Sequence, residues 1–192
     1  MFTIREIAFA ETVEKRSKFL SCLVPYSAFD IELQRLRDEH PKANHIVHAF
    51  RYINEYQQIV EGSSDDGEPK GCAGLPSLNV LRGADLVECA LLTVRYFGGI
   101  KLGTGGMARA YGTAARAAVE AARLCDYHKE RIVSFRTAYL HQRRIDYLLR
   151  ELSIQVLERD FDTDEFGYRI RGEEAVIDAF LDQAGRMVRR EE

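Results

Sequence analysis

Short runs of regularly spaced apolar residues cover most of the first two thirds of the chain. Runs in which every second residue is apolar predict strands, and apolar residues three or four positions apart predict helices. The predicted strands are residues 2–12, 17–26, 45–53, 57–62 and 86–97. The predicted helices are residues 28–40, 76–83 and 107–125. Residues 86–97 are apolar at both alternations, which is typical of a strand buried on both faces of a sheet.

From residue 128 onward the order of elements changes to strand, helix, strand, strand, helix and strand. These elements are predicted at residues 130–140, 142–152, 154–161, 165–172, 173–185 and 186–191. This order is the signature of a split βαβ, or ferredoxin-like, domain. We therefore expect an α+β protein with an N-terminal domain at residues 1–126 and a ferredoxin-like βαββαβ domain at residues 127–192.

Arg169 and Arg171 alternate with apolar residues in the second predicted domain. If the helices cover one face of its sheet, these arginines make the other face basic. Such a face is either solvated or a surface for RNA, although the aromatic pattern of an RNA-recognition motif is absent.

Composition and charge exclude several classes of protein. The chain has 46% hydrophobic and 30% charged residues, as an ordinary folded domain does, and its net charge is −3. A globally basic nucleic-acid binder is therefore excluded, and any such activity needs a local patch. No apolar run reaches transmembrane length, so we expect a cytoplasmic protein without a membrane partner. The four cysteines form no C-x-x-C pair, and the sequence offers no zinc site or other metal site of this kind.

A glycine-rich segment at residues 95–112 holds six of the fourteen glycines of the chain. It follows a predicted strand and precedes a predicted helix, so free backbone N–H groups and the helix dipole favour an anion there. Thr104 stands where a Walker P-loop requires lysine, and the match of residues 103–108 to a dinucleotide fingerprint lies too far from the strand. We predict that phosphate or nucleic acid is bound by Arg95, Gly98, Gly99, Lys101, Gly103, Gly105, Gly106 and Arg109.

Basic residues are concentrated around this segment. Three of them, Arg109, Arg116 and Arg123, are seven positions apart, so on a helix they lie nearly on one line. Either these arginines contact successive phosphates of a nucleic acid, or they form an ordinary solvated helix face. Arg109 is predicted in the first helical turn, where the dipole disfavours a cation unless an anion accompanies it.

A second candidate site is the acidic loop, which we define as Asp65, Asp66, Gly67, Glu68 and Pro69. Carboxylates this close repel one another and need a metal, an arginine or helix N-termini as partners. We prefer pairing with Arg95 or Arg109, which would hold the acidic loop over the glycine-rich segment. An exposed mobile loop is the alternative.

Histidine gives little support for a metal site. His45 and His48 are three positions apart on a predicted strand and therefore point to opposite faces.

The long motifs "SSDDGEPKGCAGLP" and "VRYFGGIKLGTGGMARAYG", in this order, resemble the signature of the IMPACT family, in particular its YigZ-like bacterial members. The segments "RSKFLS" at residues 16–21 and "ANHIVHAFR" at residues 43–51 extend the resemblance over most of residues 1–126. The acidic loop falls on one family motif. Arg95, Arg109 and the glycines between them fall on the other. The chain departs from the family pattern at two positions. The family usually has a small hydroxyl residue where this chain has Cys72, and more often an apolar residue where this chain has Lys101.

The resemblance implies an N-terminal domain of the ribosomal protein S5 domain 2-like fold and a C-terminal domain similar to a ferredoxin-like domain of elongation factor G. It also implies an association with translation, with RNA, the ribosome or a protein of the translation machinery as partner. We expect a binding protein without cofactor or catalytic residues.

The alternative is a Mg²⁺-dependent phosphoryl-transfer or phosphate-ester enzyme. Small-molecule kinases of the same fold class have a phosphate loop that is similar to residues 102–108. Asp65, Asp66 or Glu68 would then hold the Mg²⁺. No catalytic base or adenine pocket can be identified in the sequence.

Overall fold

The computed structural model describes residues 1–43 and 45–191 and consists of two compact units, Met1–Tyr127 and His128–Glu192. Each unit has its own hydrophobic core. Among the described residues, no helix is both long enough and apolar enough to span a bilayer.

The first unit is built on a five-stranded antiparallel sheet with the strand order β2-β3-β6-β4-β5. Its strands are β2 (Ala8–Glu14), β3 (Ser17–Pro25), β4 (His45–Ile53), β5 (Ile59–Ser64) and β6 (Cys89–Tyr96). The central strand β6 is buried along nearly its whole length, as its continuous apolar run predicts. A separate two-stranded sheet pairs β1 (Phe2–Ile4) with β7 (Leu124–Asp126), which ties the first residues to the end of the unit.

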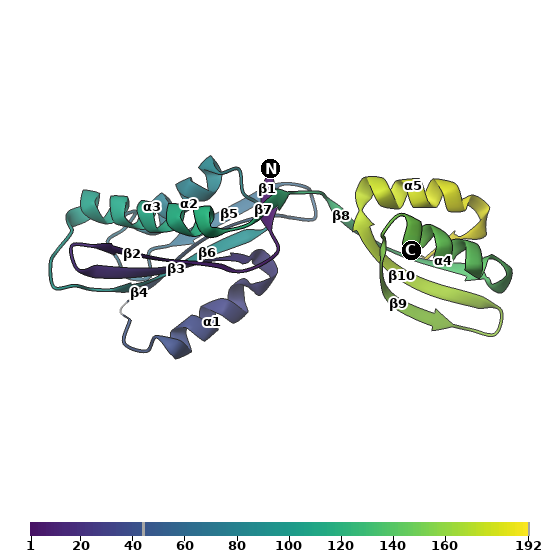
Figure 1. Cartoon of the computed structure of the whole chain (residues 1–192), viewed down its shortest axis with the longest axis horizontal. Helices are drawn as coiled ribbons and strands as arrows, with labels where there is room; N and C mark the ends of the chain where they lie inside the picture. The colour runs from purple at the N-terminus through teal and green to yellow at the C-terminus, as the bar shows by residue number, and fades with distance from the viewer. Residues whose placement is uncertain (44, 192) are drawn as a thin grey trace. The chain divides into compact units, whose positions relative to one another are not determined.

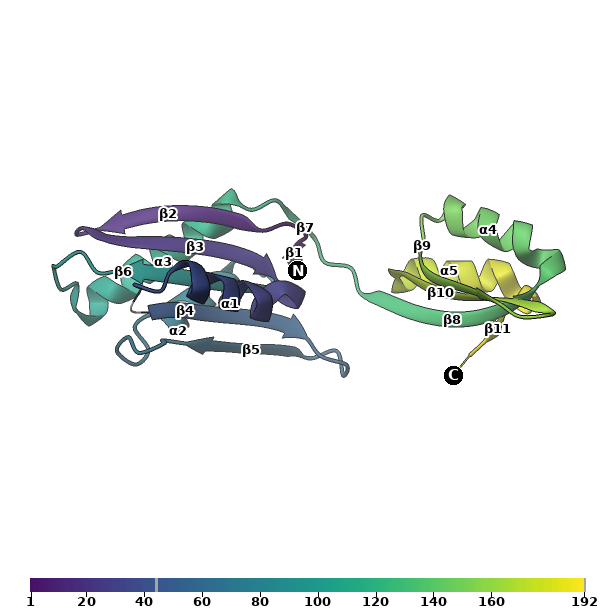
Figure 2. The same ribbon diagram turned by 90° about the horizontal axis from the view of Figure 1, so that it is seen from below.

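Helices cover both faces of the five-stranded sheet. Figures 1 and 2 show α1 (Phe29–Glu39) on one face, with α2 (Gly74–Gly83) and α3 (Gly103–Ala121) together on the other. The buried side of α3 consists largely of alanine and glycine, and such small side chains allow the helix backbone to lie close to the sheet. Helix α3 begins at Gly103 rather than at the expected Met107, so three glycines of the glycine-rich segment lie in its first turn.

The alternation of β6 decides which side chains reach the α3 face. Cys89 and Leu91 pack in the core beneath α2 and α3, whereas Ala90 and Leu92 pack in the core beneath α1. Arg95 lies on the same face of β6 as Cys89 and Leu91, because side chains an even number of positions apart share a face. It is paired in register with Phe19 of β3 and with His45 of β4, which places these side chains in one row across the sheet.

The second unit has the expected order of elements and the ferredoxin-like strand order β11-β8-β10-β9. Its elements are β8 (Glu130–Ala138), α4 (Gln142–Glu151), β9 (Gln155–Phe161), β10 (Glu165–Glu173), α5 (Glu174–Ala184) and β11 (Arg189–Arg190). Phe135, Ile145 and Phe180 are fully buried between the sheet and the two helices. The predicted α+β fold class is thus confirmed.

The open face of this second sheet is not uniformly basic, contrary to the expectation from Arg169 and Arg171. Arg136 forms ion pairs with Asp160 at 3.1 Å and with Glu191 at 2.7 Å. Glu158 lies opposite Arg169 in the register of β9 and β10. Acidic side chains from neighbouring strands therefore offset the arginines, an arrangement that the pattern of one strand does not reveal.

Candidate anion-binding site

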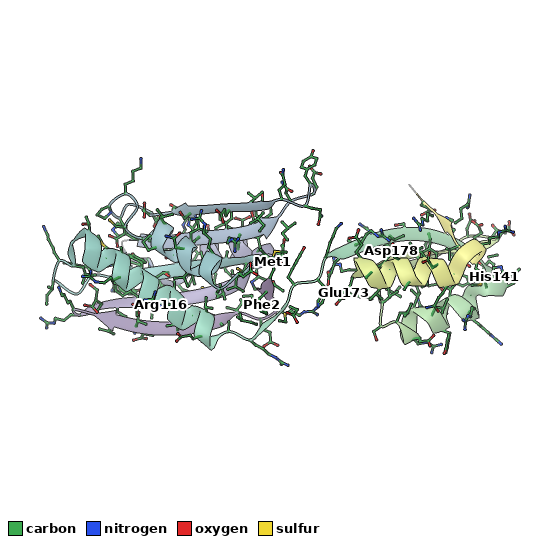
Figure 3. The ribbon with its side chains drawn as sticks, turned by 90° about the horizontal axis from the view of Figure 1, so that it is seen from above. Met1, Phe2, Arg116, His141, Glu173 and Asp178 are labelled. Carbon is green, nitrogen blue, oxygen red and sulfur yellow. The ribbon has the colours of Figure 1, made fainter. Side chains whose placement is uncertain are left out.

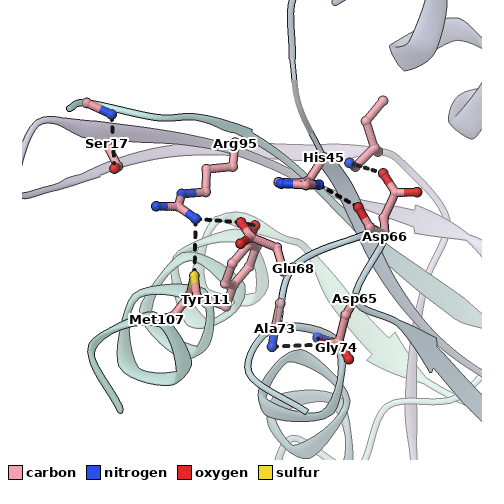
Figure 4. Close-up of polar contacts among 12 residues, drawn as sticks. Ser17, His45, Asp65, Asp66, Glu68, Ala73, Gly74, Arg95, Met107 and Tyr111 are labelled. Atoms are coloured by element: carbon pink, nitrogen blue, oxygen red, sulfur yellow. Dashed lines mark hydrogen bonds and ion pairs between the residues drawn. The ribbon is translucent and has the colours of Figure 1, made fainter. Parts of the chain in front are cut away.

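The acidic loop is fastened to the protein at three points, and Asp65 makes the first. Its carboxylate accepts hydrogen bonds from the backbone N–H groups of Ala73 at 3.0 Å and Gly74 at 2.8 Å (Figure 4). It also accepts one from the N–H of Gly71 at 2.8 Å. Asp65 therefore caps the N-terminus of α2 from a distant position, and α2 begins at Gly74 rather than at Pro76. Burial alone would raise the pKa of Asp65, but the three N–H donors together lower it below its usual value.

Replacing Asp65 with asparagine is expected to lower the free energy of unfolding by about 1–3 kcal/mol at neutral pH, because an amide cannot accept all three hydrogen bonds. The pH dependence has a defined sign. The folded pKa of Asp65 lies below the unfolded one, so its stabilisation is complete above the unfolded pKa and is lost as pH falls through the folded pKa. Urea unfolding at pH 7 and at pH 3 measures the free energy of unfolding at each pH. This free energy should fall less between the two pH values in D65N than in the unchanged protein. An equal fall in the two proteins would contradict this role of Asp65.

Asp66 makes the second attachment. Its side chain accepts a hydrogen bond from the N–H of Ile46 at 2.6 Å, and its carbonyl oxygen accepts one from Nδ1 of His45 at 2.5 Å. A carbonyl cannot donate, so Nδ1 carries a proton, and Nε2 has no hydrogen-bond partner among the residues that the structure describes. Gly67 has φ +87°, and a Cβ there would lie 3.1 Å from the His45 ring, so this close turn favours glycine.

Glu68 makes the third attachment and brings the acidic loop to β6 and α3. Its Oε1 accepts hydrogen bonds from Nη1 of Arg95 at 2.6 Å and from the hydroxyl of Tyr111 at 2.8 Å (Figure 4). The side chains of Glu68 and Arg95 are only 4% and 8% exposed, which makes this a buried ion pair. Burial, and then the charge of Glu68, raise the pKa of Tyr111, which stays a neutral donor. The predicted pairing of the acidic loop is confirmed for Arg95.

Arg109 does not share in this pairing. Among residues 1–43 and 45–191 it has no acidic partner, and Asp66 is bound to His45 and Ile46 instead. Of the two arginines predicted as alternatives, Arg95 is therefore the one that pairs with the acidic loop. The physical reason is orientation, since Arg95 projects from the sheet toward the loop whereas Arg109 lies on the exposed side of α3.

Gly98 packs closely against the backbone of Arg16 and Ser17, and its N–H is already hydrogen-bonded. Its N–H donates to Oγ of Ser17 at 3.2 Å, where the glycine-rich segment contacts the turn between β2 and β3. A Cβ on Gly98 would lie 2.0 Å from the carbonyl carbon of Arg16. Gly98 was predicted to contact phosphate, but the structure gives its N–H a partner within the protein.

Replacing Gly98 with alanine is expected to lower the free energy of unfolding by about 1–3 kcal/mol, because backbone atoms of Arg16 and Ser17 must move to make room. G83A is the matched control, since a Cβ at Gly83 meets nothing within 4 Å. Thermal unfolding of both variants checks the prediction. A G98A protein as stable as G83A would show that the contact with the turn is not tight.

The first turn of α3 is open. Its N-cap, Leu102, has no polar side chain, and Gly103, Thr104 and Gly105 are exposed. The first N–H groups of a helix have no intrahelical partner, and among the described residues no side chain accepts a hydrogen bond from those of Gly103 to Gly105. The protein itself therefore leaves this positive end of the α3 dipole unsatisfied.

The guanidinium of Arg109 lies beside this open turn. Its Nη1 is 3.8 Å from the position that a Cβ on Gly105 would occupy, so the side chain folds back along the helix toward the N-terminus. A cation at this end of a helix is unfavourable by itself. Arg109 and the exposed N–H groups together form a site that favours an anion.

Arg116 continues the basic side of α3. It lies on α3 (Figure 3), is exposed, and its Nη2 donates to Oγ1 of Thr113 at 3.1 Å. Arg109 and Arg116 line one groove of about 530 Å³ between α2 and α3. Arg123 lies beyond the end of α3 at Ala121, so the predicted line of three helical arginines is wrong for this residue.

Arg95 and Lys101 lie at a different hollow, which shares no lining residue with this groove. This cavity of about 490 Å³ is lined by His45, Glu68, Pro69, Arg95, Phe97, Lys101, Leu102, Gly103, Thr104 and Met107. The predicted phosphate contacts thus fall into two groups, with Arg109 at the groove between α2 and α3 and with Arg95 and Lys101 at this cavity. Gly99 has φ +83°. The N–H of Gly106 is already used within α3, because the N-cap carbonyl of Leu102 accepts it.

Metal binding by the acidic loop has no geometric support. Asp65, Asp66 and Glu68 each accept hydrogen bonds from protein donors. In the part of the chain that the structure describes, no group of three or more His, Cys, Asp or Glu side chains is placed to hold a metal ion. His45 and His48 lie on opposite faces as predicted, since His48 packs against Phe29 of α1.

The two compact units define a two-domain α+β protein in which the acidic loop is attached to β6 and α3. Comparison with known proteins supplies the family. Residues 15–119 match the Impact N-terminal domain. The chain is 30% identical over 161 residues to an IMPACT family member from Haemophilus influenzae, covering 82% of this chain and 78% of that protein. It is 40% identical over 105 residues to YigZ of Escherichia coli, covering 51% of this chain and 50% of that protein. The chain belongs to the IMPACT family.

A solved structure is similar in fold over nearly the whole length of the chain. The crystal structure of a hypothetical protein superposes with a TM-score of 0.70 at 26% identity, covering 98% of this chain and 95% of the other. The family predicted from the two long motifs is thus confirmed.

Proposed function

We propose that this protein is a translation-associated regulator that binds phosphate groups of RNA, free or in the ribosome, at the first turn of α3. Its membership of the IMPACT family supports the association with translation. The observation that carries the binding site is the open first turn of α3, which lies beside the guanidinium of Arg109. Among the described residues neither its first N–H groups nor this guanidinium has a side-chain partner. Such a protein works where translation occurs, in the cytoplasm.

The proposed ligands are the N–H groups of Gly103, Thr104 and Gly105 together with Arg109 and Lys101. Backbone N–H groups at a helix start donate to phosphate oxygens, and the helix dipole adds to the attraction. Arg109 and Lys101 are both exposed and have no acidic partner among the described residues. Arg95 is excluded from this set because Glu68 neutralises its charge, and Gly98 is excluded because Ser17 accepts its N–H.

The proposal favours binding over metal-dependent catalysis. A Mg²⁺-dependent enzyme would need carboxylates free to hold the ion, and those of the acidic loop are held by backbone N–H groups and by the pair of Arg95 and Tyr111. Their arrangement supports the reading that the acidic loop is a structural attachment beside the site.

The experiment is a titration of the full chain with a short single-stranded RNA, followed by fluorescence anisotropy at about 50 and 200 mM salt. Contacts to phosphate release counterions, so affinity should fall steeply as salt rises. Affinity that is absent at low salt, or that does not change with salt, would contradict the proposal. Turnover of Mg-ATP by the same preparation, without RNA affinity, would favour the enzyme instead.

A further inference from the structure

The cavity beside the first turn of α3 is larger and more apolar than a phosphate site needs. Its volume is about 490 Å³, within the usual range for pockets that take a small organic ligand. Leu102, Met107 and Pro69 form part of its wall, and the side chain of Phe97 at its edge is 52% exposed. A half-exposed phenylalanine at the edge of a pocket is available to stack on a planar group.

Arg95 lines the same cavity, and one of its polar atoms has no partner in the part of the chain that the structure describes. Its side chain is 8% exposed, and its Nε is buried without a hydrogen-bond partner among the described residues. A buried donor without a partner is costly, and such atoms in native proteins call for an explanation. The guanidinium carbon lies 5.6 Å from the ring centre of Phe97 and 5.7 Å from that of Phe19, so the cation also supports the Phe97 ring.

The cavity is lined by polar groups of two kinds. Lys101 and the exposed N–H groups of Gly103 and Thr104 suit a phosphate. His45 also lines the cavity, and its Nδ1 is bound to the carbonyl of Asp66. The second ring nitrogen of His45 points away from Asp66, on the side of Arg95, and is an acceptor for a hydroxyl or amine donor (Figure 4).

We infer that this cavity is a nucleotide subsite, with a base stacked on Phe97 and its phosphate on the first turn of α3. The inference rests on the proposed function, because both place phosphate at the same N–H groups. It adds that a single unstacked nucleotide enters the cavity. RNA bound here is therefore single-stranded, since a base within a duplex cannot reach Phe97.

The test compares three small probes by isothermal titration calorimetry with the full chain: AMP, ribose 5-phosphate and inorganic phosphate. Stacking of one base on an aromatic side chain commonly contributes tenfold or more to affinity. AMP should therefore bind at least about tenfold more tightly than ribose 5-phosphate. F97A should remove this difference without changing the affinity for ribose 5-phosphate. F161A is the matched control, because Phe161 is 78% exposed in the other unit.

The outcomes separate this inference from the proposed function. Equal affinities for AMP and ribose 5-phosphate, or an F97A protein that keeps the preference for AMP, would overturn the base subsite and leave the phosphate site standing. If no small probe binds but RNA does, the RNA affinity of F97A decides. Affinity unchanged by F97A overturns the subsite, and a loss of about tenfold supports it. Failure of RNA and all three probes to bind would reject the proposed function itself.

Discussion

Replacing Glu68 with alanine is expected to lower the free energy of unfolding by about 3–5 kcal/mol, because the buried guanidinium of Arg95 is left without its counter-charge. The hydroxyl of Tyr111 loses its acceptor in the same variant. Urea denaturation at neutral pH measures the change. E120A is the matched control, since Glu120 is exposed on α3 and its replacement should change stability by less than about 0.5 kcal/mol.

A second variant separates loss of the ion pair from loss of packing. Replacing Arg95 with methionine in the E68A protein removes the uncompensated charge, and part of the lost stability should return. An E68A protein as stable as E120A would contradict the assignment of Glu68 and Arg95 as the attachment of the acidic loop. A double variant no more stable than E68A would show that packing, not charge, accounts for the loss.

Replacing Arg109 with glutamate is expected to weaken binding of single-stranded RNA by at least about tenfold, since a cation beside the proposed phosphate becomes an anion. The slope of log affinity against log salt should also fall by about one, because one phosphate contact is lost. Fluorescence anisotropy over a range of salt concentrations measures both quantities.

R143E is the control for this second prediction. Arg143 is exposed on α4 of the other unit, and R143E changes the net charge by the same amount. Neither variant should lower the unfolding temperature, because neither arginine has an ion pair among the described residues. Equal losses of RNA affinity in R109E and R143E would mean that net charge, rather than the start of α3, determines binding.

Much of the fold could be predicted because the periodicity of the apolar residues is clear. The run at residues 86–97 reads as a buried central strand, and the order of elements after residue 128 reads as ferredoxin-like. The starts of α2 and α3 could not be predicted in the same way. Helix α2 is capped by Asp65 through a contact made only in the folded chain, and α3 begins with glycines that intrinsically disfavour helix.

The candidate site was predictable only where charge required a partner. Clustered carboxylates implied an arginine, and Glu68 does pair with Arg95. The sequence could not separate Arg95 from Arg109, because the choice depends on which face of β6 or α3 each side chain occupies. The use of Gly98 to contact the turn at Arg16 was also not visible, since it depends on a contact between distant segments. The same holds for the orientation of His45 by the carbonyl of Asp66, which no local pattern signals.

The most direct test of the phosphate site is an NMR titration of ¹⁵N-labelled protein with a short single-stranded RNA at low salt. The account predicts that the largest changes in amide chemical shift occur at Gly103, Thr104 and Gly105, whose N–H groups have no side-chain acceptor in the described part of the chain. Changes confined to the second unit or to the opposite face at α1, with these three amides unmoved, would contradict it.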